Sequence, residues 1–201
     1  MPNRLVIASG NPGKVLEIKA ILAGLEVAIL SAKECGVILN VPENGQSYAE
    51  NAKLKALAYQ EATGEVVLAD DSGLEVDALQ GAPGIHSARY APQPHASDAD
   101  RRAYLLEQLA GKPQPWPAHF HCTAILATPE GQIYESEGIC EGQIITTERG
   151  AGGFGYDPIF FLPGRQVTMA EIPASLKNQI SHRARAVRAL LPVLHKVFHY
   201  P

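Results

Sequence analysis

Near its start the chain changes from the spacing of a strand to the spacing of a helix. An apolar run over residues 4–8 stops at a cluster of turn residues, Ser9-Gly10-Asn11-Pro12-Gly13. After this cluster the apolar residues follow helical spacing, at Val15, Ile18 and Leu22. The opening therefore predicts a strand, a tight loop and a helix, which limits the chain to folds that combine both.

The rest of the chain alternates between expected strands and helices. Further strands are expected over residues 27–30, 66–69, 118–128, 132–139 and 159–162, with residues 141–146 continuing the sheet. Helices are expected over residues 47–63, over residues 97–109 and over residues 180–194, where Pro192 should interrupt the helix. Turn residues 129–131 join two of the strands as a hairpin. The pattern predicts an α/β (α+β mixed) fold with a mixed sheet.

Composition and charge exclude several classes of protein. Of the 201 residues, 46% are hydrophobic and 19% charged, which is enough apolar surface for a folded core. The formal net charge of -4 leaves no strongly basic field, so no stable nucleic-acid partner is expected. No apolar run approaches the roughly 20 residues that span a bilayer, so no membrane partner is expected. We expect residues 1–201 to form a single domain with two lobes.

The three cysteines indicate a reducing environment. Cys35, Cys122 and Cys140 are odd in number and contain no C-x-x-C pair. This argues against a disulfide framework and against a zinc cage. We therefore expect a cytoplasmic protein.

The motif Ser9-Gly10-Asn11-Pro12-Gly13-Lys14 is the first candidate site. A strand that enters a helix through a glycine-containing loop directs free backbone N–H groups and the positive end of the helix dipole toward one point. Lys14 in the first helical turn opposes that dipole, and this local cost is explained if an anion binds there. Ala8 and Val15 stand where a Walker A loop has glycine and Ser/Thr, so the motif is not that loop. An ordinary turn with a solvated lysine is the alternative.

Acidic residues at the expected end of a buried strand form the second candidate. Asp70-Asp71-Ser72-Gly73 follows residues 66–69, and neighbouring strand residues point to opposite faces, so only one of these carboxylates should reach a given ion. The other ligand must come from elsewhere, and Glu43, in the polar loop before residue 47, is the best candidate. Two carboxylates with phosphate oxygens and water form a normal Mg²⁺ site. A turn capped by an aspartate is the alternative.

The third candidate is a glycine-rich segment, Gly150-Ala151-Gly152-Gly153-Phe154-Gly155-Tyr156-Asp157-Pro158. It matches the dinucleotide-binding pattern G-x-G-x-x-G, but Pro158 and an apolar strand follow it instead of a helix, so a dinucleotide fold is not expected. The glycines would let backbone approach a planar ligand, with Phe154 stacking on it and Asp157 accepting from ring N–H groups. A glycine-rich hairpin with core aromatic residues is the alternative.

The fourth candidate is Lys177-Asn178-Gln179-Ile180-Ser181-His182-Arg183-Ala184. Ser181 could cap a helix and leave His182 and Arg183 in its first turn. Two potential cations there oppose the helix dipole and suggest an anionic or carbonyl-bearing ligand. A charged, solvated helix face with one ordinary histidine is the alternative.

Together these motifs resemble those of the inosine/xanthosine triphosphate pyrophosphatases, the family also called ITPases or dITP/XTP diphosphatases. The resemblance runs nearly end to end, through the blocks SGNPGK, PENGQSYAENAKLKA, LADDSGLEVDALQGAPGIHSARYA, FHC, GGFGYDPIFF and AEIPASLKNQISHRARA. Six blocks in one order and at the spacing of the family are far more specific than any block alone.

The resemblance implies a role for each motif. The triphosphate would be bound by Ser9, Gly10, Asn11, Pro12, Gly13 and Lys14, helped by Asn51 and Lys55. Glu43 and Asp71 would hold the metal ion, with Asp71 also the general base and Ser72 a substrate contact. The nucleoside would be bound by Phe154, Gly155, Tyr156, Asp157, Lys177, His182 and Arg183. Donors such as His182 and Arg183 facing O6 would favour a 6-oxo purine over adenine.

The resemblance also implies an architecture and an activity. The expected fold is a long, curved mixed sheet flanked by helices, with two lobes around a central nucleotide cleft, in a homodimer. The expected activity is hydrolysis of dITP, ITP and XTP or dXTP to the monophosphate and pyrophosphate, which would keep these nucleotides out of DNA and RNA. At least one Mg²⁺ per subunit is implied, with Mn²⁺ as the other candidate.

Two other functions remain as alternatives. One is a pyrophosphatase of modified pyrimidine nucleotides, as in the related Maf-like group. The other is a non-enzymatic nucleotide- or RNA-binding module that uses the helix carrying Arg183, Arg185 and Arg188.

Overall fold

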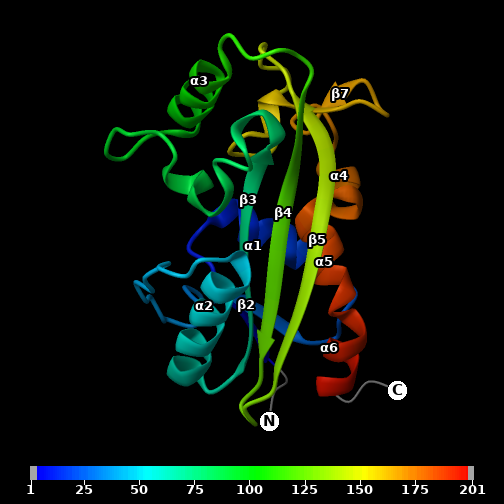
Figure 1. Cartoon of the computed structure of the whole chain (residues 1–201). Coiled ribbons are helices and arrows are strands. Elements are labelled where there is room, and N and C mark those ends of the chain that lie inside the picture. The colour runs from blue at the N-terminus through cyan, green and yellow to red at the C-terminus, as the bar shows by residue number, and fades with distance from the viewer. Residues whose placement is uncertain (1–3, 199–201) are drawn as a thin grey trace. The chain divides into compact units, whose positions relative to one another are not determined.

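The computed structural model describes residues 4–198, which form two compact units (Figure 1). Unit 1 comprises residues 4–71, 122–138 and 182–198. Unit 2 comprises residues 72–121 and 139–181. The chain therefore passes from one unit to the other four times, and each unit is assembled from segments that lie far apart in the sequence.

The strands of the described part form one seven-stranded sheet in the order β2-β1-β3-β4-β5-β6-β7. Their bounds are β1 Arg4–Ile7, β2 Ala28–Ser31, β3 Val66–Val76, β4 Trp116–Ala127, β5 Ile133–Ile144, β6 Phe160–Leu162 and β7 Val167–Thr168. Strand β1 pairs in parallel with β2 and β3, whereas β6 pairs antiparallel with β5 and β7. The predicted mixed sheet of an α/β fold is confirmed.

Two of the helices in the described part were predicted to within a residue. The bounds of the helices are α1 Pro12–Ile21, α2 Tyr48–Thr63, α3 Asp98–Leu109, α4 Ala174–Ile180, α5 His182–Ala189 and α6 Leu191–Val197, with short 3₁₀ turns η1 Asp77–Leu79, η2 Gly84–Arg89 and η3 Asp157–Ile159. The Ser47 hydroxyl accepts from the Glu50 N–H at the start of α2, and Gly64 ends that helix with φ of 67°. Ser97 and Asp100 form a capping box on α3. Within residues 4–198 no helix is both long and apolar enough to cross a membrane.

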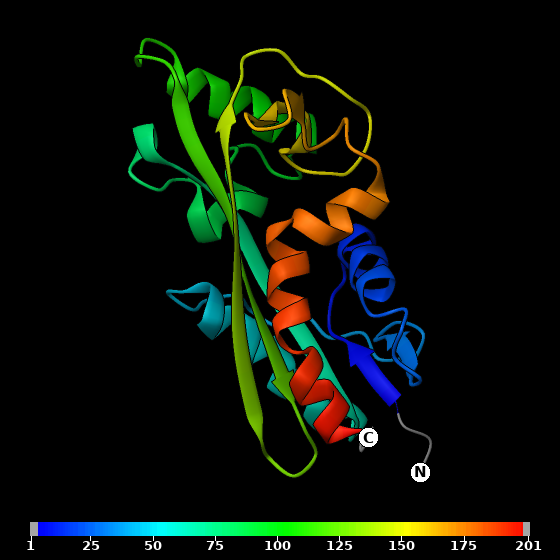
Figure 2. The same ribbon diagram turned by 90° about the vertical axis from the view of Figure 1, so that its right-hand side faces the viewer.

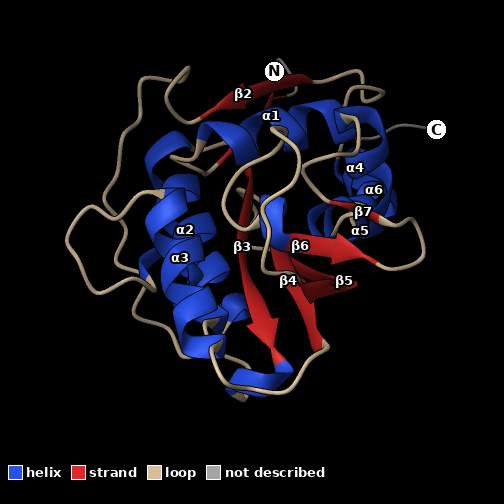
Figure 3. Cartoon of the chain, turned by 90° about the horizontal axis from the view of Figure 1, so that it is seen from above, coloured by secondary structure: helices blue, strands red, loops and turns tan. Residues whose placement is uncertain are grey.

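Strand alternation sets up the two faces of unit 1. Odd and even residues of β1 and β3 belong to different apolar clusters: Leu5, Ile7, Val66 and Leu68 pack with α1, α5 and α6, and Val6, Val67 and Ala69 pack with α2. Figure 3 shows α2 and the pair α5–α6 on opposite sides of β3. The same alternation sends the next two side chains, Asp70 and Asp71, to opposite faces.

The predicted end of the third strand was wrong. Strand β3 does not stop at Ala69 but runs through Asp70 and Asp71 to Val76, and both aspartates are buried. Acidic residues usually mark strand ends, but here lysine and arginine side chains from the flanking helices compensate both carboxylates, so the strand can continue. The alternative of a capped turn at this motif is excluded.

The helix expected over residues 180–194 is divided into two, α5 and α6, and a further helix, α4, precedes it. Ser181, with φ of -66° and ψ of 159°, has extended backbone that ends α4 and precedes α5. Pro192 lies in the first turn of α6 and separates it from α5, as predicted, because proline has no N–H to continue a helix. Figure 2 shows α5 and α6 as separate helices in succession.

Unit 2 has its own apolar core. Helix α3 contributes Leu105 and Leu109, and the rings of Phe120 in β4 and Phe160 in β6 pack with their centroids 4.4 Å apart. The strand expected over residues 159–162 is shortened by η3 to β6.

Candidate active site

The loop between β1 and α1 is held together by its own side chains. Asn11 is the N-cap of α1, and its Oδ1 accepts from the backbone N–H groups of Gly13 (2.8 Å) and Lys14 (3.2 Å). The Ser9 hydroxyl accepts from the N–H of Asn11 at 3.2 Å. Asparagine is a strong N-cap, and Asn11 satisfies the N–H groups of Gly13 and Lys14 itself, so these two are not the free donors that the loop was expected to present. The predicted contacts of residues 9–14 with a triphosphate stay predictions.

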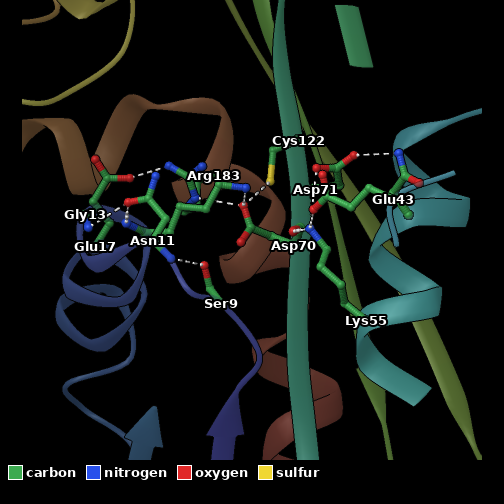
Figure 4. Close-up of polar contacts among 12 residues, drawn as sticks. Ser9, Asn11, Gly13, Glu17, Glu43, Lys55, Asp70, Asp71, Cys122 and Arg183 are labelled. Carbon is green, nitrogen blue, oxygen red and sulfur yellow. Dashed lines mark hydrogen bonds and ion pairs between the residues drawn. The ribbon is translucent and has the colours of Figure 1, made fainter. Parts of the chain in front are cut away.

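Lys14 is not a solvated lysine but part of a chain of alternating charges. Its Nζ lies 3.0 Å from Asp70 Oδ2, and the same oxygen accepts from Arg183 Nε at 3.0 Å. The Arg183 guanidinium also binds Glu17 of α1. Figure 4 shows Arg183 reaching toward both carboxylates, with the Cys122 thiol directed at Asp70. The chain of charges ties β3 to α1 and α5 within unit 1.

The charged forms of Asp70 and Arg183 are strongly stabilised by their ion-pair partners. Burial would raise the pKa of Asp70, but the positive charges of Lys14 and Arg183 outweigh it and hold that pKa well below its usual range. Burial would lower the pKa of Arg183, but Asp70 and Glu17 hold it above its usual range. Burial, with Asp70 nearby, raises the pKa of the Cys122 thiol to about 12. Arg183 is only 1% exposed, so its predicted donation to a purine O6 would compete with these ion pairs.

On the other face of β3, Lys55 of α2 lies against Glu43 and Asp71. Its Nζ donates to Glu43 Oε1 at 2.8 Å and to the carbonyl oxygen of Asp70 at 2.7 Å, and it lies 3.5 Å from Asp71 Oδ1. Figure 4 shows these acceptors grouped around the end of the Lys55 side chain. The structure thus brings together the two carboxylates that the sequence paired.

Burial and the charges of opposite sign shift the pKa values of Asp71 and Lys55 in opposite directions. Burial raises the pKa of Asp71, and Glu43 and Asp70 add to that shift although Lys55 and Lys14 oppose it. Burial would lower the pKa of Lys55, but Asp71, Asp70 and Glu43 together raise it. Lys55 is therefore charged at neutral pH.

The residues around Lys55 fit a divalent cation. Glu43 Oε1, Asp71 Oδ1 and the carbonyl oxygen of Asp70 all face one positive charge, and such hard oxygen donors are those that Mg²⁺ prefers. Glu43 and Asp71 would hold the ion. In the described residues no group of three or more His, Cys, Asp or Glu side chains is placed to hold a metal ion.

Asn51 fixes the loop that carries Glu43. Its Oδ1 accepts from the Gly45 N–H at 2.9 Å, and its Nδ2 donates to Asp71 Oδ2 at 3.2 Å. A Cβ at residue 45 would lie 2.7 Å from the Cβ of Glu50 and 2.8 Å from Asn51 Oδ1, so only glycine allows this approach. Asn51 is fully buried and positions both proposed metal ligands, and its predicted contact with a phosphate stays a prediction.

In unit 2 the glycine-rich segment places Phe154 beside a buried ion pair. Asp157 Oδ2 binds Lys177 Nζ and accepts from the Phe154 N–H at 2.9 Å. The Lys177 ammonium lies 4.8 Å from the centroid of the Phe154 ring, a cation–π distance. A Cβ at Gly153, where φ is +70°, would lie 2.0 Å from Asp157 Oδ2, so glycine is required. The half-buried Phe154 ring is therefore held by a rigid, charged support.

Two neighbours of Phe154 hold the segment in place. The Gly155 N–H donates to Asp98 Oδ2 at 2.7 Å, and its carbonyl accepts from Arg102 at 2.8 Å. Tyr156 is buried in the core of unit 2, and its hydroxyl donates to the carbonyl of Ser87 at 2.9 Å. The Tyr156 side chain is therefore a core aromatic residue, as the alternative interpretation had it, and its predicted substrate contact stays a prediction.

The remaining predicted residues lie in different units. Ser72 is half-buried in β3 and begins unit 2, whereas His182 is buried at the start of α5 in unit 1. Their predicted substrate contacts stay predictions. Sequence reasoning missed Glu17 and the function of Asp70 as a counter-ion; the position of Glu17, three residues after Lys14 on one helix face, was the available signal.

A family comparison identifies the chain. The model of the Ham1 family matches residues 5–193, which include every predicted site residue. The chain belongs to the Ham1 family. It is 45% identical over 196 residues to a dITP/XTP pyrophosphatase of Desulforamulus reducens, covering 97% of each chain. It is 46% identical over 188 residues to a dITP/XTP pyrophosphatase of Geobacter sulfurreducens, covering 93% of this chain and 94% of the relative.

A solved Ham1 structure supports the same assignment. The structure of a HAM1 protein from Coxiella burnetii superimposes with a TM-score of 0.86 at 40% identity, covering 96% of this chain and 99% of that one. The resemblance that the motifs indicated is confirmed, and Ham1 family membership extends over both units.

Proposed function

We propose that the chain hydrolyses nucleoside triphosphates of 6-oxo purines, dITP, ITP and XTP or dXTP, to the monophosphate and pyrophosphate, with Mg²⁺ as the metal. The observation that carries the proposal is the arrangement around β3 in unit 1. Lys14 and Lys55 supply positive charge, and Glu43 and Asp71 form a carboxylate pair beside it. The names of Ham1 relatives as dITP/XTP pyrophosphatases support the choice of substrate.

The chain's residues divide the work of phosphoryl transfer. When bound at Glu43 and Asp71, Mg²⁺ would neutralise charge on the phosphates and on the pyrophosphate that leaves. Lys14 and Lys55 would add positive charge on the leaving group. Asp71 would accept the proton of the water that attacks the α-phosphorus in line, so that the new P–O bond forms as the bond to the β-phosphate oxygen breaks.

The nucleoside is assigned to Phe154, Gly155, Tyr156, Asp157 and Lys177 of unit 2 and to His182 and Arg183 of unit 1. Phe154 would stack on the base, and Asp157 and Lys177 would hold the Phe154 ring in place. Buried donors facing O6 would reject adenine, whose amino group would leave them unpaired. We also propose that the protein acts in the cytoplasm, as its cysteine pattern indicates, and that it is a homodimer, as the resemblance implies. Sedimentation of the purified chain would test the homodimer.

The products of dITP hydrolysis test the proposed function. With Mg²⁺ we expect dIMP and pyrophosphate in equal amounts, identified by chromatography and by a pyrophosphate-specific assay. Removal of Mg²⁺ by a chelator should stop the reaction. Release of orthophosphate and dIDP would reject the proposed bond of cleavage, and faster turnover of methylated pyrimidine triphosphates than of dITP would favour the Maf-like alternative.

One of the three arginines on which the RNA-binding alternative depends is buried. Arg183 is 1% exposed and bound to Asp70 and Glu17, so it cannot contribute to a basic surface. Arg185 and Arg188 remain exposed, and two charges are too few to hold RNA against the net charge of -4.

Replacing Phe154 by alanine should weaken substrate binding. Loss of a stacked aromatic ring costs about 1–3 kcal/mol per base, so we expect KM for dITP to rise about tenfold or more with a smaller change in kcat. Steady-state kinetics of pyrophosphate release would measure both. Phe161→Ala is the matched control, since Phe161 in β6 also lies under a cation, that of Arg149 at 5.7 Å. A KM of Phe154→Ala equal to that of Phe161→Ala and of wild type would show that Phe154 does not contact the substrate.

A further inference from the structure

The position of the Lys55 ammonium has a consequence for metal binding. It lies 2.8 Å from Glu43 Oε1 and 3.5 Å from Asp71 Oδ1, the two carboxylates proposed as metal ligands, and it donates to the Asp70 carbonyl at 2.7 Å. The side chain is 11% exposed, so water cannot replace these contacts freely. One ammonium is thus the shared counter-ion of both carboxylates of the proposed site.

The present position of Lys55 disfavours a divalent ion at these oxygens. Mg²⁺ binds oxygen at about 2.0–2.1 Å, so an ion ligated by Glu43 and Asp71 would fill the space next to both oxygens that Nζ occupies. Two positive charges a few ångströms apart in a largely buried site also repel strongly. The ammonium and the divalent ion would therefore compete for the pair.

We propose that Lys55 is an internal counter-ion that competes with the divalent cation for Glu43 and Asp71 and is displaced when the cation binds. This inference rests on the proposed metal site. The four-carbon stem of lysine lets the ammonium swing away while α2 stays in place. Asn51 keeps Asp71 and the Glu43 loop in position throughout, so only Lys55 has to move. Cation binding would thereby free a positive charge for the phosphates.

Metal affinity without nucleotide tests the exchange. Lys55→Met removes the charge and retains a side chain of similar length. We expect Mn²⁺, followed by its electron paramagnetic resonance signal, to bind this variant at least about tenfold more tightly than wild type, a change of about 1.4 kcal/mol. Lys53→Met, on the exposed side of α2, is the matched control and should bind like wild type.

The outcomes separate the inference from the proposed function. Equal Mn²⁺ affinity of Lys55→Met and wild type overturns the competition but leaves the metal site standing. Absence of Mn²⁺ binding in all three proteins overturns both. Weaker Mn²⁺ binding by Lys55→Met also contradicts the proposed competition, because it would mean that Lys55 favours binding of the ion.

A second measurement uses the wild-type protein and so does not depend on a folded variant. Buried contacts protect Lys55 from acetic anhydride, and displacement should expose it. We expect Mg²⁺ to raise the acetylation of Lys55 several-fold relative to Lys53, measured by peptide mass spectrometry without nucleotide. An unchanged or lower ratio at saturating Mg²⁺ overturns the exchange.

Discussion

Asp71→Asn should lower the rate of pyrophosphate release from dITP by at least about 100-fold, the usual cost of removing a general base. The substitution keeps the size of the side chain and one oxygen for the Asn51 amide, which donates to Asp71 at 3.2 Å. It removes the negative charge that faces Lys55 and the proposed ion. Stability should change little, whereas both proton transfer and metal ligation are lost.

The neighbouring aspartate provides a discriminating comparison. Asp70 is directed at Lys14 and Arg183 on the other face of β3, so Asp70→Asn should leave the Mn²⁺ affinity within about threefold while Asp71→Asn abolishes measurable binding. Asp77→Asn, at an exposed position, controls for the substitution itself. A rate for Asp71→Asn within fivefold of wild type, with the fold intact by circular dichroism, would contradict the assignment of base and metal ligand.

The separation of Asp70 from Asp71 was predictable because it depends on local geometry alone. Side chains alternate along a strand with a period of two, and that rule requires no knowledge of the fold. The start and end of α2, at Ser47 and Gly64, were equally local. The sequence signal failed where local preference and distant partners disagree: two adjacent aspartates and a serine are typical of a turn, yet β3 continues through them.

The ion-pair partners of the site residues could not be predicted from local sequence patterns. Arg183 binds Asp70 across 113 residues and Glu17 across 166 residues of sequence, so no spacing pattern relates them. The motif nevertheless marked Lys14 and Arg183 as cations in unfavourable first helical turns. The sequence suggested a bound ligand as the compensating charge, whereas the fold shows that Asp70 and Glu17 lie beside these cations.

Removal of the Arg183 guanidinium should strongly destabilise the protein. Arg183→Met would leave Asp70 with Lys14 alone and Glu17 without its main cation, in a region where the arginine side chain is 1% exposed. Breaking a buried ion pair by removing one partner costs about 3–5 kcal/mol. We expect a loss of this size in the free energy of unfolding, measured by urea titration and circular dichroism.

Variants at the same chain of charges show whether the ion pairs are responsible. Arg183→Lys keeps the charge but cannot reach both carboxylates with a planar fork, so an intermediate loss is expected. Arg185→Met, on the exposed side of α5, should cost less than about 1 kcal/mol. In an Asp70→Asn background the effect of Arg183→Met should shrink, because the counter-charge is already gone. An undiminished effect in that background would show that Arg183 stabilises unit 1 through packing of its side chain instead of through Asp70.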